Sequence, residues 1–367
     1  MRTTAVCLIL LLTPMQAAEL TTADTWLAHT QIAPAMQVPA NLAAWEQQRT
    51  QIRAKLIDLL GDLPPRPPVS AIQVTSREDK GAYTLETIQF DNGVGEIVKG
   101  YMFVPKSATA QSKAPAILYC HWHGGQYDIG KDELLGTNAT PVAAGPALAA
   151  AGYVVLGIDA PCFGERNGQG PDGPQQKGNA GEMTAAKFHL WAGRTLWGMM
   201  LRDDLTALDY LCSRPEVDAQ RIGVTGISMG STRSWWLMAL DDRPRAAVCV
   251  GCMTRYEELI RAGMLKAHGI YYFVPGMLKH FDTEAVIALA APRPILFMTG
   301  DQDGGSPVAG VRHLGDIVSQ VYALHGDDAT QRFENTIYPD VGHVYLPEMW
   351  EKTLLWMERW VKGPGEK

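Results

Sequence analysis

The sequence predicts an α/β fold built on a mainly parallel central sheet. After Pro115, short apolar runs that suit buried strands alternate with longer segments of helical periodicity. In Arg221–Trp236, a β-branched run leads into Gly-x-Ser-x-Gly and then into a helix-compatible stretch. Three strand-like runs before Pro115 are separated by turn-rich segments. We therefore expect antiparallel N-terminal strands followed by a parallel sheet with helices on both faces.

The first 67 residues are expected to lie outside this sheet. Met1–Ala18 combines a basic start, a short apolar run and a small-residue ending, which is typical of a signal peptide and predicts a secreted or periplasmic protein. The apolar run is too short to span a membrane. Asn41–Leu60 repeats apolar residues at helical spacing and is followed by glycine and prolines. Residues 19–67 are therefore expected to form a helical extension.

Residues 68–367 are expected to form one main domain. Asp91–Gly93 suits a tight hairpin connection. Two long segments, 163–197 and 256–281, interrupt the alternation and are expected as insertions at the carboxyl ends of strands. The predicted strands are Ala71–Ser76, Tyr83–Phe90, Glu96–Val104, Ala116–Cys120, Tyr153–Ile158, Arg221–Thr225, Ala246–Val250 and Pro294–Met298. The predicted helices include Pro146–Ala151, Leu196–Leu211 and Met349–Val361.

Composition excludes several classes of partner. Of the 367 residues 46% are hydrophobic and 19% charged, as in an ordinary globular protein, and the formal net charge is −7. Without a dense Lys/Arg run, neither nucleic acid nor an anionic membrane surface is expected as a partner. No later segment is long and apolar enough to predict a membrane span. Cys249 and Cys252 form a lone C-x-x-C in an apolar run, which favours a buried strand over a redox or zinc site.

Ser228 is the candidate nucleophile. In a strand–turn–helix carrying Gly-x-Ser-x-Gly, the serine stands on a strained backbone at the carboxyl edge of a sheet. Gly226 and Gly230 are expected to be glycine because a side chain there would collide with the neighbouring strand or helix. The backbone amide of Met229, at the start of the helix, is then placed to stabilise a developing negative charge.

A serine hydroxyl needs a base, and the base needs a carboxylate to orient it. The predicted strand Pro294–Met298 runs into a loop that carries Asp301 and Asp303, two candidate carboxylates. His343 follows in a glycine-containing loop before the last predicted helix. The chain order serine, aspartate, histidine is that of the α/β-hydrolases.

A second oxyanion donor is expected in the loop after the strand Ala116–Cys120. This loop reads His-Trp-His-Gly-Gly, and the backbone amide of either His123 or Gly125 suits the role. His121 and His123 are an alternative metal pair, but no further cluster of ligands accompanies them. Asp301 and Asp303 begin like a calcium loop that then fails. We therefore expect no metal and no cofactor.

Beyond the GISMG elbow, the sequence contains CHWHGG, DAPCFGER, the run RDDLTALDYLCSRPEVDAQRIGVTG, APRPILFMTGDQD and PDVGH. With these motifs, the chain from about Asn41 onward resembles the secreted bacterial α/β-hydrolases of the dienelactone-hydrolase-like and acetyl-xylan-esterase-like group. The resemblance implies a serine esterase in which Ser228, Asp303 and His343 form the triad. Ser231 departs from the pattern, because a third glycine is more usual there.

The substrate is expected to be a small or carbohydrate-linked ester, of acetyl type. Aromatic residues in or near the insertions, namely Trp122, Trp191, Tyr271 and Tyr272, either form a platform for a sugar or aryl group or pack long loops. A serine peptidase of the prolyl-oligopeptidase type uses the same triad, but no propeller-like N-terminal repeat is present. A binding protein on a hydrolase scaffold is the alternative outside enzymes.

Overall fold

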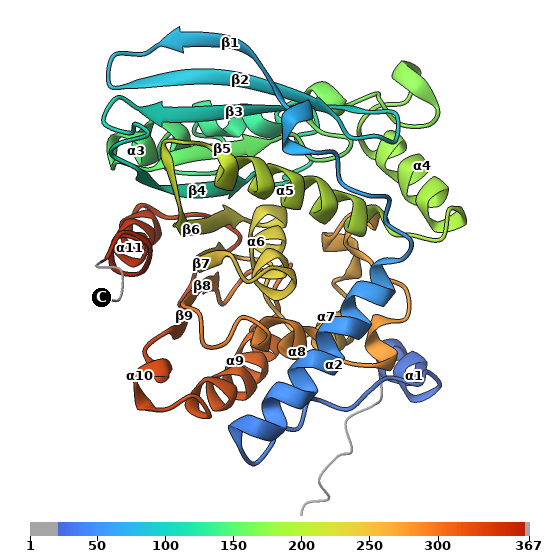
Figure 1. Ribbon diagram of the computed structural model, residues 1–367. Coiled ribbons are helices and arrows are strands. Elements are labelled where there is room, and N and C mark those ends of the chain that lie inside the picture. Colours follow the sequence, from blue (N-terminus) through green and yellow to red (C-terminus); the bar gives the residue numbers. More distant parts are fainter. Residues whose placement is uncertain (1–20, 364–367) are drawn as a thin grey trace, which may run out of the picture.

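The computed structural model describes residues 21–363. The expected signal peptide, residues 1–18, lies outside the described residues. The described chain is organised around one nine-stranded sheet in the order β1-β2-β3-β5-β4-β6-β7-β8-β9, which runs from top to bottom in Figure 1. The strands β1, β2, β3 and β5 pair antiparallel, and all later pairs are parallel. The predicted α/β-hydrolase fold is therefore confirmed.

All eight predicted strands are present, with ends that differ by a few residues, and a ninth was missed. The strands are β1 (Gln73–Asp79), β2 (Tyr83–Asp91), β3 (Ile97–Pro105), β4 (Ala114–Cys120), β5 (Val154–Ile158), β6 (Val217–Ile227), β7 (Pro244–Val250), β8 (Ile295–Gly300) and β9 (Phe333–Tyr338). Every residue of β4, β5 and β8 is buried, because helices cover both faces of the sheet.

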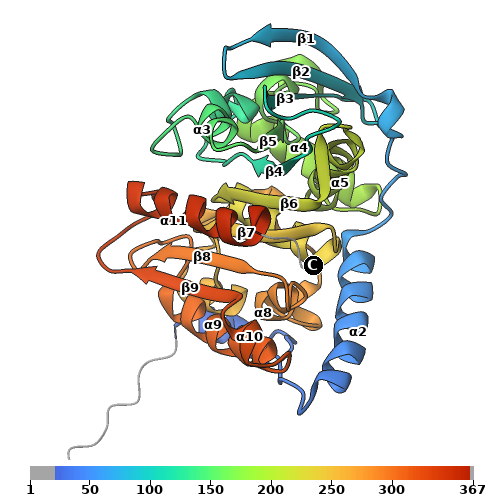
Figure 2. The ribbon, with the colours of Figure 1, turned by 60° about the vertical axis from the view of Figure 1, so that its left-hand side comes forward.

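Two hydrophobic cores lie on the two faces of the sheet. One contains buried residues of α2 (Leu42–Leu60), α5 (Leu196–Ser213), α6 (Met229–Leu240), α8 (Thr283–Ala288) and α9 (Val308–Ala323). The other contains buried residues of α3 (Ala144–Ala150) and α11 (Pro347–Met357). Figure 2 shows α3 and α11 on one side of the sheet, with α5 and α2 on the other.

The helix α2 packs against the main domain. It begins at the N-cap Asn41, whose side chain accepts the Ala44 amide at 3.0 Å, and ends at Gly61, whose φ is 89°. Trp45 and Leu56 are fully buried, together with parts of α6 and α8. Outside the core, the two terminal guanidinium nitrogens of Arg53 donate to the carboxylate of Asp242 at 2.9 and 2.7 Å.

The remaining helices lie in the extension, the insertions and a late connection. They are α1 (Thr22–Ala28), α4 (Gly178–Trp191), α7 (Tyr256–Arg261) and α10 (Asp327–Thr330). The carboxyl ends of β4, β6, β7, β8 and β9 meet at one edge of the sheet, so their following loops share one end of the molecule. Among residues 21–363, no helix has the length and apolar character needed to cross a membrane.

Candidate active site

Ser228 stands between the end of β6 and the start of α6, with φ 60° and ψ −122°. This conformation is strained for a residue with a side chain. The Ser228 amide donates to the Val250 carbonyl at 2.8 Å and so holds the turn against β7. A Cβ on Gly226 would come within 2.2 Å of the Cys120 carbonyl oxygen, and one on Gly230 within 1.9 Å. Glycine at both positions therefore follows from close contact with β4.

The histidine and an aspartate meet across two loops. His343 Nδ1 lies 2.7 Å from Oδ2 of Asp303, whose other oxygen accepts the Gly305 amide at 2.8 Å. The carboxylate side chain is 2% exposed and the imidazole 32%. Burial raises the pKa of Asp303, but the hydrogen bonds from His343 and Gly305 outweigh it, and the pKa lies below its ordinary value. Asp303 is therefore an ionised acceptor that orients the ring.

Asp301 has a different contact. Its carboxylate accepts the Asp340 amide at 2.8 Å and so ties the loop after β8 to the loop after β9. The Gln302 amide donates to the Val341 carbonyl in the same crossing, at 2.9 Å. A Cβ on Gly300 would lie 2.0 Å from that carbonyl oxygen. Asp301 braces the loops that bring Asp303 and His343 together.

Cys252 lies beside the nucleophile, which the sequence did not predict. Its Sγ is 3.6 Å from Ser228 Oγ, and it adopts φ 50° just after β7. Burial raises the pKa of the Cys252 thiol to about 12, so the neighbour of the hydroxyl is a neutral thiol. The five described cysteines form no disulfide.

The backbone of Gly251 supports the imidazole of His343. A Cβ on Gly251 would lie 2.9 Å from Cε1 of that ring. The hydroxyl of Ser231, which departs from the usual glycine, donates to the Gly251 carbonyl at 2.6 Å. Ser231 thus connects α6 to Gly251, whose backbone contacts the His343 ring.

Two buried side chains hold the start of the loop after β4. The Trp122 amide donates to Oε2 of Glu133 at 2.7 Å. His121 Nε2 accepts the Ala160 amide at 3.0 Å, so its proton is on Nδ1, which lies 2.7 Å from the Trp122 carbonyl. Burial and then the charge of Arg233 lower the pKa of His121 well below its ordinary value. His121 is a neutral structural residue here.

The amides of His123 and Gly125 differ in this structure. The Gly125 amide donates to His123 Nδ1 at 3.0 Å and is therefore already engaged. Within the part of the chain that the structure describes, the His123 and Met229 amides donate no hydrogen bond. Of the two alternatives that the sequence left open, the His123 amide is thus the one that its own loop does not use.

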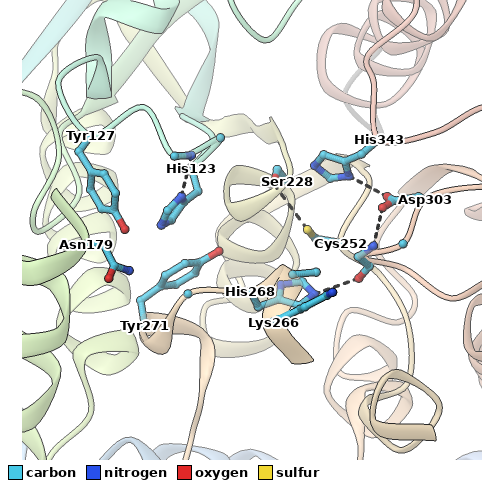
Figure 3. A pocket seen from close by; sticks show the side chains of 16 residues that line it. His123, Tyr127, Asn179, Ser228, Cys252, Lys266, His268, Tyr271, Asp303 and His343 are labelled. Carbon is cyan, nitrogen blue, oxygen red and sulfur yellow. Dashed lines mark hydrogen bonds and ion pairs between the residues drawn. The ribbon is translucent and has the colours of Figure 1, made fainter. Parts of the chain in front are cut away.

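A cavity of about 600 Å³ opens in front of Ser228. Figure 3 shows His343 and Asp303 on one side of the serine, with His123, Tyr127, Asn179 and Tyr271 grouped on the other. Sequence reasoning missed several lining residues, because their place at the cavity depends on loops that the fold brings together. The missed side chains are Tyr127, Asn179, Cys252, Lys266 and His268.

Only one of the four predicted aromatic contacts lines this cavity, and that residue is Tyr271. The Trp122 ring packs beneath Gly124, where a Cβ would come within 2.6 Å of it. Tyr272 is buried and stacks on His268 with ring centroids 4.1 Å apart. Trp191 is 96% exposed at the end of α4 and lines a separate cavity. Of the two alternatives that the sequence left open, Trp122 and Tyr272 therefore fit the packing of loops, while Trp191 faces away from the cavity in front of Ser228.

The described residues contain no group of three or more His, Cys, Asp and Glu side chains placed to hold a metal ion. Both histidines of the alternative metal pair have their ring nitrogens in hydrogen bonds within the protein.

The fold agrees with comparisons to known proteins. A family model described as Abhydrolase family matches residues 28–326. The chain belongs to the Abhydrolase family. It is 35% identical over 316 residues to "Putative hydrolase YtaP" of Bacillus subtilis (strain 168), covering 85% of this chain and 100% of that protein.

Two solved structures share the fold of this Abhydrolase family member. One is described as a "putative acetyl xylan esterase (BF1801)" of Bacteroides fragilis NCTC 9343, with TM-score 0.68 and 21% identity over 91% of this chain and 87% of that one. The other is a glucuronoyl esterase from Solibacter usitatus, with TM-score 0.64 and 20% identity over 89% and 98%.

Proposed function

We propose that the protein is a serine carboxylic ester hydrolase that works through an acyl-Ser228 intermediate. The observation that carries the proposal is the 2.7 Å contact between His343 Nδ1 and Asp303, next to a serine on a strained elbow. A neutral histidine whose Nδ1 proton is held by a carboxylate presents Nε2 as a base.

In the first half of the reaction, Ser228 Oγ turns from Cys252 toward His343 and attacks the ester carbonyl carbon. His343 Nε2 takes the hydroxyl proton, and Asp303 supports the resulting imidazolium. The negative charge on the carbonyl oxygen is received by the amides of Met229 and His123. The tetrahedral intermediate collapses, and the C–O bond to the alcohol breaks as that oxygen takes the proton from His343.

In the second half, water attacks the acyl carbon while His343 removes its proton. The proton then returns to Ser228 Oγ as the carboxylic acid leaves. No step requires a metal or an organic cofactor.

The substrate class is a small or carbohydrate-linked ester, of acetyl type. Support comes from the wall of the cavity, where Asn179, Lys266 and Tyr271 offer polar and aromatic contacts of the kind that hold sugars. The similar structures named as acetyl xylan and glucuronoyl esterases point to the same class. Residues 1–18 act as an export signal in this proposal, followed by the extension 19–67 and the catalytic domain 68–367.

The test is a comparison of the protein with Ser228→Ala. We expect the wild type to release acid from acetylated xylo-oligosaccharides or a methyl glucuronate ester, and to bind one equivalent of an organophosphonate. The alanine variant should lose labelling and turnover while keeping its melting temperature. Labelling at another residue, or turnover of dipeptidyl amides in preference to esters, would contradict the proposal.

A further inference from the structure

We infer that Glu182, on the inserted helix α4, is a positioning residue that sets the shape of the oxyanion loop through His123. The inference rests on the proposed function, because it concerns the donor that this reaction needs. Glu182 is fully buried and lies 59 residues from His123 in the chain. The insertion that carries α4 therefore also contacts the loop that holds the oxyanion donor.

The hydrogen bonds fix both the place and the tautomer of His123. The Gly125 amide donates to Nδ1 at 3.0 Å, so Nδ1 carries no proton and the proton of the neutral ring is on Nε2. Nε2 lies 2.9 Å from Oε2 of Glu182 and donates to it. A carboxylate at this position selects the tautomer that can accept the Gly125 amide. Without the Glu182 carboxylate, the His123 ring is not held in the tautomer whose Nδ1 accepts the Gly125 amide.

Three aromatic rings hold the same imidazole. Tyr271 stacks on it with centroids 5.1 Å apart, while Phe163 and Tyr127 each meet it edge-on at 4.9 Å. Tyr127 also donates its hydroxyl to Oε2 of Glu182 at 3.2 Å. Phe163 and Glu182 come from the first insertion, and Tyr271 comes from the second. Both insertions therefore converge on one side chain of the oxyanion loop.

The side chain of His123 closes the backbone turn that runs from His123 to Gly125. Gly124 and Gly125 both have positive φ, 50° and 70°, and the ring-to-amide bond spans the turn from His123 to Gly125. On the other side, Glu133 holds the Trp122 amide. The free His123 amide lies between these two anchored peptides. Because oxyanion donors must match the position of the developing charge closely, a loosened turn lowers the rate without unfolding the protein.

Glu182 also carries a cost that packing alone does not explain. Within residues 21–363, its second oxygen, Oε1, is buried without a hydrogen-bond partner. A buried polar atom of this kind costs stability, and an apolar side chain would avoid the penalty. The presence of a hydrogen-bond acceptor here despite this cost agrees with a role in orienting His123.

The test measures kcat and KM for soluble ester turnover in a set of variants. Glu182→Ala and His123→Ala should each lower kcat by about ten- to a hundredfold with KM little changed, a part of the loss seen when an oxyanion donor is removed. Glu182→Gln should recover most of kcat, because its carbonyl oxygen accepts the same hydrogen bond. The kcat of His123→Asn should be higher than that of His123→Ala, because the side-chain carbonyl of an asparagine can accept the backbone amide two residues later, here that of Gly125.

The decisive comparison is the double variant. If Glu182 acts through His123, then Glu182→Ala costs nothing further in the His123→Ala background. Additive losses, or a folded Glu182→Ala with wild-type kcat, would overturn the inference. Should Glu182→Ala fail to fold, equal kcat in folded His123→Asn and His123→Ala would overturn it instead.

Two controls separate the possible failures. Glu284 is also a fully buried carboxylate, but it binds Arg255 and the Met36 amide, away from this loop. Glu284→Ala should lower the melting temperature and leave kcat unchanged. Ser228→Ala in the same assay tests the proposed function alone: if it stays active, the esterase mechanism fails, whereas an inactive Ser228→Ala beside an unaffected Glu182→Ala rejects only the role of Glu182.

Discussion

Two aspartates of one loop, two positions apart, have different partners. Asp303 accepts from His343, while Asp301 accepts the amide of Asp340, a residue with φ 58°. The contact of Asp303 fixes which nitrogen of His343 carries the proton, whereas the contact of Asp301 fixes the path of the backbone between the two loops. Their effects on turnover should therefore differ in size.

Asp303→Asn should lower kcat by about ten-thousandfold, the size of the corresponding change in serine proteases, because an amide favours the wrong tautomer of His343. Asp301→Asn keeps one acceptor oxygen for the Asp340 amide, so its effect should be mild. Turnover measured at matched melting temperatures checks both. If Asp301→Asn were the more damaging, the orienting carboxylate would have to be reassigned.

The sequence was informative about residues fixed by local backbone, and less so about residues brought together by the sheet. The elbow around Ser228 could be predicted because the serine and its two glycines fall within five consecutive residues between a strand and a helix. Cys252 could not, since its position beside Ser228 depends on β7 lying next to β6. Trp191 was misplaced because an aromatic residue in a helical insertion does not reveal which end of α4 meets the cavity.

At the scale of elements, the short helical segment Gly130–Leu135 anchors the loop that follows β4. Glu133, in the segment Gly130–Leu135, is fully buried and accepts both the Tyr119 hydroxyl at 2.6 Å and the Trp122 amide at 2.7 Å. Burial raises the pKa of Glu133 from 4.5 to about 7, against the lowering effect of these two donors. The fold thus binds a proton here more tightly than the unfolded chain does.

This shift predicts a pH dependence of stability. Because the folded pKa is raised, the contribution of Glu133 to the free energy of unfolding is full below pH 4.5 and is lost as pH rises through about 7. Glu133→Gln cannot ionise, so its unfolding free energy should fall less than that of the wild type between these pH values. Denaturant titrations at several pH values measure the difference. A wild-type to variant difference that stays constant with pH would contradict the shifted pKa.

Elements that the sequence did not predict have a common physical cause. In α9, Gly310 and Gly315 interrupt the apolar stripe, and glycines ordinarily count against a helix. Here a Cβ on Gly310 would lie 2.2 Å from the Thr254 hydroxyl, and one on Gly315 would lie 2.4 Å from the Asn335 amide nitrogen. In the edge strand β9 only Phe333 is buried, so this strand lacks the apolar signal of the central strands. Tertiary packing overrides local propensity in both.

At the scale of the whole molecule, α2 closes the core on the face of the sheet that carries α6 and α8. Trp45 is fully buried there, although it lies in the segment expected as an extension. The extension therefore shares the core of the main domain, and the stability of the two should be coupled.

Trp45→Ala should lower the free energy of unfolding by about 3–5 kcal/mol, the usual cost of removing a buried aromatic side chain. Because Trp45 lies far along the chain from Ser228 and outside the cavity, kcat of the folded fraction should not change. Urea denaturation together with turnover measures both. The matched control is Trp26→Ala, since Trp26 is 74% exposed and its loss should cost about 0.5 kcal/mol or less. Equal destabilisation by the two would show that α2 does not share the core.

The position of α2 has a further consequence for the order in which the molecule assembles. Arg49 donates to the Leu289 carbonyl across 240 residues, so α2 is synthesised early and its docking surface late. Most of the stability of a helix such as α2 comes from tertiary packing of its apolar residues rather than from helix propensity. Until both α6 and α8 have formed, the surface that the apolar residues of α2 cover is incomplete, and closing so long a loop is slow. We therefore expect α2 to dock among the last elements. Until then its apolar residues are exposed on the nascent chain, where a chaperone would bind them.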